Sequence, residues 1–108
     1  MSDYEVYWTP TALQDLESIL SHIAAEHPAA AVSASTRLEA RAESLGTLTP
    51  RGRTVPELRD IGVHQYRELI ERPWRVIYTV ETKRVAVVAV LDARRDLQTL
   101  LLERLIRS

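Results

Sequence analysis

Arginine side chains are the main candidates for chemistry in this sequence, and four of them could act together. Arg67 and Arg75 lie in two neighbouring segments that alternate like strands, and Arg94 and Arg95 directly follow a long apolar segment. A guanidinium group offers a planar fork of donors that binds phosphates and carboxylates. In an antiparallel sheet these four cations could converge at one end and bind a phosphate backbone or an acidic protein face. Alternatively, each arginine could pair with a nearby acid and hold the sheet together, the candidates being Glu68, Glu71, Asp92 and Asp96.

One aromatic residue lies beside these arginines. Trp74 follows Pro73 and directly precedes Arg75, so it could be an exposed side chain that stacks on a partner or anchors it. A strand tryptophan is more often part of the hydrophobic core, and both interpretations stay open at this point. The predicted target-binding residues are therefore Arg67, Trp74, Arg75, Arg94 and Arg95.

Charge is distributed unevenly along the 108 residues, although the net charge is only −1. Residues 1–50 include two basic and seven acidic residues, whereas residues 51–108 include twelve basic and eight acidic ones. Of the fourteen basic residues only Lys83 is a lysine, a preference that a GC-rich genome would also produce. A pI near 6.3 argues against a general nucleic-acid coat. The pattern indicates two opposed surfaces, one for a target and one for a partner.

Several classes of active site have no counterpart in the sequence. The three glycines, at positions 46, 52 and 62, match no phosphate-binding fingerprint. The three histidines, at positions 22, 27 and 64, lack metal-ligand spacing and are expected at the surface. No serine, histidine and aspartate grouping suggests a triad, and the chain has no cysteine. We therefore expect neither a cofactor nor a metal.

The first half of the chain is predicted to form a short strand and a helical hairpin. Residues 4–8 alternate and are rich in aromatic side chains, as in a strand. Thr9 and Pro10 indicate a helix start, Pro28 separates this helix from a second one, and Gly46 is placed to end the second. The expected buried faces are Leu13, Leu16, Leu20, Ile23 and Ala24 in the first helix, and Ala31, Ala34, Leu38, Ala42 and Leu45 in the second.

The second half is predicted to form a loop, three strands and a last helix. Residues 46–56 contain two glycines and two prolines, which is typical of a loop. Residues 64–71 and 74–80 alternate, and residues 85–91 are apolar throughout, as in a strand that is buried on both faces. The short connections imply an antiparallel meander, and Asp96 could cap a C-terminal helix.

These elements predict an α+β fold with an N-terminal strand, an α-helical hairpin, an antiparallel β meander and a C-terminal helix. The whole chain, residues 1–108, is expected to be one domain. No apolar run approaches the roughly 20 residues that cross a bilayer, and the N-terminus lacks the pattern of a secretory signal. We therefore expect a cytoplasmic protein that does not bind membranes.

Three segments of the chain resemble the RelE/ParE superfamily of toxins from type II toxin–antitoxin systems. They are WTPTALQDLESILSHIA, VPELRDIGVHQYRELIERPWRVIYTV and VAVVAVLDARRDL, which together span most of the chain in order. The most specific pieces are Tyr66-Arg67-Glu68-Leu69, Arg75-Val76-Ile77-Tyr78 and the Arg94-Arg95-Asp96 ending. The resemblance implies a small antiparallel sheet packed against a helical hairpin, in agreement with the predicted elements.

The superfamily has two toxic activities. RelE-like members cut messenger RNA in the ribosomal A site with the 2′-OH as nucleophile, which needs cationic groups, a base and an acid. In the resemblance, Arg75 matches the sheet arginine of that branch and Arg67 falls where a basic strand residue lies. Arg94 or Arg95 matches its late arginine.

The acid–base pair of the RelE-like branch is not evident. Leu69 stands at the next basic strand position, and no tyrosine or histidine follows Tyr78. A ribonuclease would need Tyr66, Glu68 or His64 as a substitute. The Arg-Arg-Asp-Leu ending resembles ParE-like members, which are not nucleases and instead poison DNA gyrase and block replication. The resemblance thus implies a gyrase inhibitor more than an enzyme, with a RelE-like ribosome-dependent mRNA endonuclease, or a paralogue with a third target, as alternatives.

The same resemblance implies partners. A cognate ParD-like antitoxin should neutralise the toxin by direct binding, through a disordered segment that folds on the toxin, and such modules serve in plasmid stabilization. The alanine-rich helix face and the stripe formed by Leu102 and Ile106 are the predicted antitoxin-binding surfaces, although the stripe could instead be an oligomer contact or end-of-chain packing. Arg51, Arg53 and Arg59 could meet an acidic antitoxin segment or be solvated. Nucleic acid is expected only indirectly, through gyrase or the antitoxin, and either a homodimer or a hetero-oligomer with the antitoxin would fit.

Overall fold

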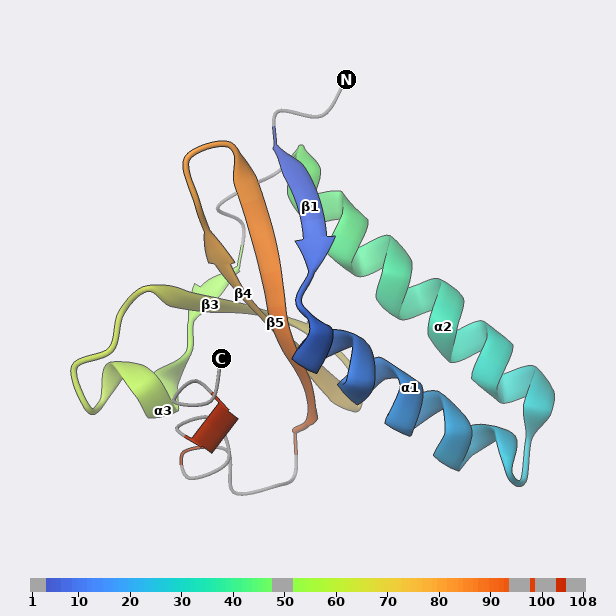
Figure 1. Ribbon diagram of the computed structural model, residues 1–108. Helices are drawn as coiled ribbons and strands as arrows, with labels where there is room; N and C mark the ends of the chain where they lie inside the picture. The colour runs from blue at the N-terminus through green and yellow to red at the C-terminus, as the bar shows by residue number, and fades with distance from the viewer. Residues whose placement is uncertain (1–3, 48–51, 94–97, 99–102, 105–108) are drawn as a thin grey trace.

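The computed structural model describes residues 4–47, 52–93, 98 and 103–104, and a five-stranded sheet lies at its centre (Figure 1). The strands lie in the order β1-β5-β4-β3-β2, with β1 parallel to β5 and all other neighbours antiparallel. The strands are β1 (Glu5–Trp8), β2 (Arg53–Thr54), β3 (Tyr66–Glu71), β4 (Trp74–Val80) and β5 (Arg84–Asp92). The predicted α+β class is confirmed, whereas β2 lies inside the segment that was predicted to be a loop.

Strand β5 is buried on both faces, as its uninterrupted apolar run predicts. Its register with β4 skips Val88, which forms a β-bulge. Because of this extra residue, Val85, Val87 and Val90 all belong to the core that faces the long helices. Strict alternation would have turned Val90 to the other face, so the bulge keeps valines against the helices along most of the strand.

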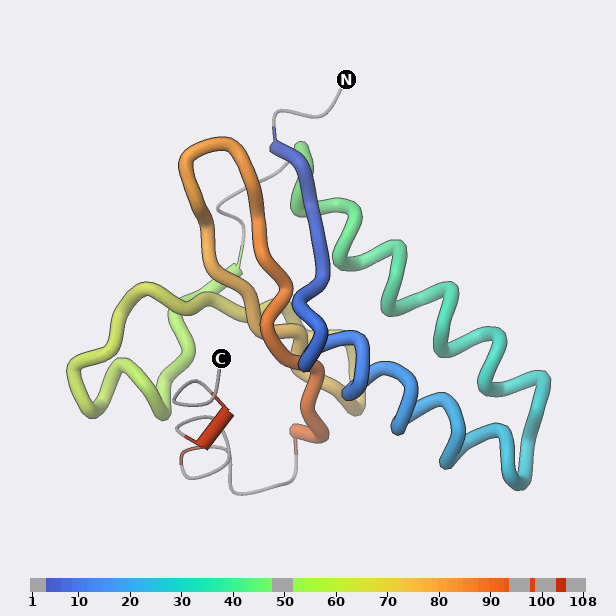
Figure 2. Tube along the Cα trace, in the orientation of Figure 1, coloured from blue at the N-terminus to red at the C-terminus, as the bar shows by residue number. Residues whose placement is uncertain are grey.

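Two long helices cover one face of the sheet. They are α1 (Pro10–Ala24) and α2 (Pro28–Glu43), and a 3₁₀ turn, η1 (Ser44–Gly46), follows α2. The chain reverses between the two helices, which lie side by side (Figure 2). The Thr9 hydroxyl accepts a hydrogen bond from the Ala12 N–H at 3.2 Å, which confirms Thr9 as the N-cap of α1.

The buried faces of the helices match the prediction for α2 but only in part for α1. All five expected residues of the second helical segment are buried, from Ala31 to Leu45. In α1, Leu13 is 51% exposed, and the prediction that it belongs to the buried stripe is wrong. Leu16 is buried as predicted, and Leu20 and Ile23 are partly buried against the core. Ala12 and Asp15 are buried in addition, although they were not expected there. Ala24 is also exposed, since it lies in the last turn of α1.

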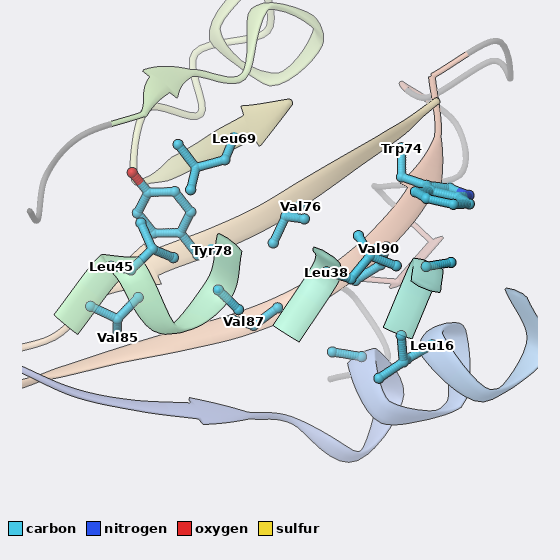
Figure 3. Packing of buried hydrophobic residues seen from close by; sticks show 13 residues of the cluster. Leu16, Leu38, Leu45, Leu69, Trp74, Val76, Tyr78, Val85, Val87 and Val90 are labelled. Carbon is cyan, nitrogen blue, oxygen red and sulfur yellow. The ribbon is translucent and has the colours of Figure 1, made fainter. Parts of the chain in front are cut away.

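The main hydrophobic core lies between these helices and the sheet (Figure 3). Trp74 packs at one end of this layer near Leu38 and Val90, and Tyr78 lies at the other end near Leu45. Small alanines on α2 let the helix approach the strands closely. The core therefore depends on a few large side chains, of which Tyr78 and Leu38 are the largest that are fully buried.

The opposite face of the sheet is covered by the short helix α3 (Pro56–Arg59), which the sequence did not predict. Val55 and Leu58 are fully buried there and pack with Ile77, Ala89 and Leu91 of the sheet. This second, smaller core fixes the segment between β2 and β3 over the sheet (Figure 1).

The predicted C-terminal helix, with Asp96 as its cap, lies largely outside the described residues. Among the residues that the structure does describe, no helix combines the length and the apolar character that crossing a bilayer requires.

Candidate functional site

A network of buried charges centred on Arg75 lies on the face of the sheet away from the long helices. Arg75 lies on the middle strand β4, opposite Ile70 of β3 and Leu91 of β5, and its side chain is only 6% exposed. Its Nε donates to Oε1 of Glu68 at 2.5 Å, and its Nη1 and Nη2 donate to the two carboxylate oxygens of Glu57 at 2.7 and 2.8 Å. Every nitrogen of this guanidinium therefore already donates to a carboxylate.

Glu68 connects this network to β2. Its side chain is completely buried, and its second oxygen accepts a hydrogen bond from the Nε of Arg53 at 2.6 Å. Arg53 and Glu68 are directly opposite each other in the β2–β3 register. Two guanidiniums thus share one buried carboxylate, and such pairing is what makes a fully buried charge tolerable.

Arg75 and Glu57 keep their charges at neutral pH. Burial alone lowers the pKa of Arg75, but the hydrogen bonds and charges of Glu57 and Glu68 outweigh it and hold this pKa above its ordinary value. The hydrogen bond from Arg75 in turn lowers the pKa of Glu57. The pair therefore acts as a fixed ion pair at neutral pH and not as a proton donor or acceptor.

The start of the β2 segment is tied to the sheet at a glycine that leaves no room for a side chain. The N–H of Gly52 donates to the hydroxyl of Tyr78 at 2.7 Å, and its carbonyl oxygen accepts from the Nη1 of Arg67 at 2.9 Å. A Cβ at Gly52 would lie 2.2 Å from the backbone oxygen of Glu68. The β2–α3 segment is therefore held to the sheet through Gly52, Arg53 and Glu57.

A cavity of about 610 Å³ opens beside the charge network, between β2 and the turn that joins β3 to β4. Its walls are formed by three arginines and three apolar residues, namely Arg53, Arg72, Arg75, Ile70, Pro73 and Ala93. Arg72 is exposed, and its guanidinium makes no hydrogen bond or ion pair with any residue in the described part of the chain. The arrangement can bind an anionic group through Arg53 and Arg72, because guanidinium forks bind carboxylates and phosphates.

A second buried charge joins α1 to β5. Asp15 is buried, and its Oδ2 accepts from the N–H of Val90 at 3.1 Å while its Oδ1 accepts from the Nη1 of Arg104. β1 pairs with β5 only as far as Val87, so the carboxylate satisfies an N–H group beyond the end of that pairing. Arg104 is thereby bound to α1 close to the end of β5.

The predicted convergence of four arginines is wrong for the two that can be placed. Arg67 lies opposite Tyr78, on the face toward the long helices, whereas Arg75 lies opposite Ile70 on the other face. Residues that pair across β3 and β4 have one odd and one even position, whereas 67 and 75 are both odd, so the register places these two side chains on opposite faces. Arg75 instead follows the alternative of pairing with Glu68, with Glu57 as an additional, unexpected partner. Arg94 and Arg95 lie outside the described residues.

Trp74 is a core residue in the structure. It is 8% exposed and belongs to the main hydrophobic core. The guanidinium of Arg37 lies 5.7 Å from the centre of its ring, and Arg37 and Arg41 both pair with Glu71. Its position therefore favours the core interpretation, while binding to a target is untested for Trp74 as for the four arginines.

The remaining predicted sites divide into exposed residues and residues beyond the described ranges. His22, His27 and His64 are all exposed, in agreement with the surface interpretation. Over residues 4–47, 52–93, 98 and 103–104, no group of three or more histidines and acids could hold a metal ion. Leu102 and Ile106, the predicted antitoxin stripe, lie outside the described residues.

Three important residues were not singled out from the sequence. Glu57 and Arg72 are separated from Arg75 by a loop and a turn whose geometry no periodicity encodes. Asp15 had a usable signal, because it precedes Ile19 by four positions and Ile23 by eight, which places it on the helix face that packs against the core.

Comparisons with known proteins give a match to a family model and a match in fold to a solved structure. Residues 6–97 match the family model described as the ParE toxin of the type II toxin-antitoxin system, parDE. A solved structure described as the chromosomal ParDE TA system from P. aeruginosa is similar in fold, with a TM-score of 0.69 and 22% sequence identity. The similarity covers 83% of this chain and 96% of that one. Among curated proteins, none matches the sequence significantly.

Proposed function

We propose that this chain, which belongs to the ParE toxin family of type II toxin–antitoxin systems, inhibits DNA gyrase and is neutralised by direct binding of a cognate ParD-like antitoxin. The chain acts in the cytoplasm as a single-domain toxin, where it blocks replication. The absence of tyrosine and histidine after Tyr78 and the Arg94-Arg95-Asp96-Leu97 ending support this branch of the superfamily over the ribonuclease branch.

The state of Arg75 is the observation that carries the proposal. In the resemblance to RelE-like toxins, Arg75 occupies the position of the sheet arginine that would stabilise the charge developing on a cleaved phosphate. Here all three nitrogens of its guanidinium donate to Glu57 and Glu68, and the side chain is 6% exposed. A guanidinium that is already neutralised by two carboxylates is poorly placed to stabilise a phosphorane.

The substitute bases are equally ill placed for ribonuclease chemistry. Glu68 is completely buried between two guanidiniums, which leaves no path from its carboxylate to a 2′-OH. Tyr66 packs against the smaller core, and His64 is exposed outside the cavity beside Arg75. A general base must come within hydrogen-bonding reach of the proton that it removes. This geometry supports inhibition by binding, with no covalent chemistry performed by the toxin.

Membership in a toxin–antitoxin family supports the antitoxin as the second partner. A free gyrase poison would kill the cell that makes it, so a neutralising protein must be present. In this proposal the antitoxin binds the folded toxin and prevents its contact with gyrase. In a plasmid-borne copy, a cell that loses the plasmid can no longer replace the more labile antitoxin, and the remaining toxin then acts on that cell. Such a module stabilises plasmids in this way.

Induction in a host that lacks the antitoxin tests the proposal in cells. A gyrase poison should produce filamentous cells with an induced DNA-damage response while protein synthesis continues at first. Co-expression of the cognate antitoxin should prevent both effects. Immediate translation arrest with intact chromosomal DNA would contradict the proposal and point to a ribosomal target.

A further inference from the structure

Two arginines beside the charge network, Arg53 and Arg72, line the cavity with N–H groups that no described residue accepts from. Arg53 uses its Nε for Glu68, and its side chain is 61% exposed, so its two terminal amino groups remain open to the cavity. The guanidinium of Arg72 is exposed and unpaired within the described residues. Arg75, by contrast, uses all three of its guanidinium nitrogens for Glu57 and Glu68. The cavity therefore presents the unpaired guanidinium of Arg72 and the exposed terminal amino groups of Arg53 beside the buried, paired Arg75.

The other described residues that line the cavity are apolar. They are Ile70, Pro73 and Ala93, and among the lining residues that the structure describes none is aromatic. Two guanidiniums above an apolar floor match a carboxylate side chain that lies next to an apolar one. A single-stranded nucleic acid is usually bound by aromatic side chains that stack on its bases and by an extended row of cations along its backbone.

We infer that this cavity is the docking site for an acidic–apolar segment of the antitoxin. The inference rests on the proposed function, because it assigns a place on the toxin to the partner proposed there. A volume of about 610 Å³ accommodates a few side chains of an extended segment, whereas a folded protein surface would not reach into it. Segments that fold on binding present side chains in that manner.

Docking at this place would couple the antitoxin to the β2–α3 segment. Arg53 lies on β2 and Arg72 lies in the turn between β3 and β4, so a carboxylate bound by both would bridge these two segments. The antitoxin segment would thus contact the sheet face that bears Arg75 and shield it.

Affinity measurements with charge-neutralising variants test the assignment. The toxin and the antitoxin encoded beside it are purified separately, and binding is measured by isothermal titration calorimetry at low and high salt. Arg72→Gln removes a guanidinium that makes no hydrogen bond or ion pair within the described residues, and the Arg53→Gln/Arg72→Gln double variant removes both cations. Arg84→Gln is the matched control, because Arg84 is 52% exposed and lies at the start of β5, beside β1 and away from the cavity.

We expect affinity to fall by roughly threefold to tenfold in Arg72→Gln and by about tenfold to a hundredfold in the double variant, with a weaker salt dependence. Arg84→Gln should bind within about twofold of the wild type. Circular dichroism and thermal unfolding test whether the double variant, in which residue 53 loses its bond to Glu68, remains folded. The single variant Arg72→Gln decides the question if the double variant does not fold.

Other outcomes overturn the assignment in distinguishable ways. Equal affinity of the wild type and both variants would overturn the docking site while leaving the proposed function intact. If the wild type fails to bind the antitoxin, the proposed function fails and the docking site with it. Binding of a labelled single-stranded RNA that is lost in the double variant would assign the cavity to nucleic acid. Loss of gyrase inhibition with unchanged antitoxin affinity would assign it to gyrase.

Discussion

Glu57 on α3 and Arg75 on β4 are joined by two parallel hydrogen bonds of 2.7 and 2.8 Å, although they lie 18 positions apart in the sequence. This pair fixes α3 over the smaller hydrophobic core. In the function proposed above, the same pair neutralises the arginine that a RelE-like ribonuclease would need.

Neutralising either carboxylate that pairs with Arg75 should destabilise the fold, and the more deeply buried carboxylate should have the larger effect. Glu57→Gln keeps the side-chain shape but weakens two charge-assisted hydrogen bonds, and should lower the free energy of unfolding by about 1–3 kcal/mol. Glu68→Gln should cost more, about 3–5 kcal/mol, because it leaves buried Arg75 poorly compensated. Urea unfolding followed by circular dichroism measures both.

Glu81→Gln serves as the control for that series. Glu81 pairs with Arg84 at 3.3 Å on the surface, where both side chains are more than 40% exposed. An exposed pair contributes less than about 1 kcal/mol. If Glu57→Gln and Glu68→Gln are no more destabilising than Glu81→Gln, the network does not hold α3 in place.

Stability should decrease at acidic pH because of Glu57. Its pKa is lowered in the folded state from an ordinary value of 4.5, mainly by the hydrogen bond from Arg75. The unfolded chain therefore binds a proton more readily, and the contribution of Glu57, complete above pH 4.5, is lost as the pH falls through the folded-state pKa. The difference in unfolding free energy between wild type and Glu57→Gln should shrink between pH 6 and pH 3. A constant difference over that range would contradict the pKa assignment.

A methyl group at Gly52 should disturb the β2 segment. In Gly52→Ala the new Cβ would lie 2.2 Å from the Glu68 carbonyl oxygen and 2.7 Å from the Tyr78 hydroxyl, so backbone must move. We expect a loss of more than about 2 kcal/mol and faster amide exchange at Arg53 and Thr54. Gly62→Ala is the comparison: Gly62 has a φ of 85° but open space around it, and should cost only about 1 kcal/mol.

The contact between Asp15 and Arg104 should hold the end of the chain against α1. Asp15→Asn retains an acceptor for the Val90 N–H but loses the charge that binds Arg104, whereas Asp15→Ala loses both. A double-mutant cycle of Asp15→Asn and Arg104→Gln should give a coupling energy of about 0.5–3 kcal/mol. Exchange of the Val90 amide should accelerate strongly only in Asp15→Ala. Additive effects of the two substitutions would show that this ion pair contributes nothing.

The sheet and the two long helices could be predicted because their residues repeat at strand and helix periods. The apolar run at 85–91 and the alanine face of α2 gave buried elements as expected. Leu13 was assigned wrongly because periodicity defines a stripe on a helix but not the angle at which that helix crosses the sheet.

The charge network could not be predicted from the same patterns. Whether Arg67 and Arg75 share a face depends on the register across the β3–β4 turn, and one residue of difference reverses it. Glu57 becomes a partner of Arg75 only because Val55 and Leu58 bury themselves against the sheet and thereby place α3. Long-range packing decides such contacts, and local propensity carries no information about them.

The most direct measurement adds purified toxin to DNA gyrase and supercoiled or relaxed plasmid, with a ribosome-dependent mRNA cleavage assay run in parallel. We predict that the toxin inhibits supercoiling and accumulates double-strand breaks with gyrase covalently attached, that the antitoxin reverses both effects, and that messenger RNA stays intact. Unaltered gyrase at micromolar toxin together with cleaved message on ribosomes would contradict the account.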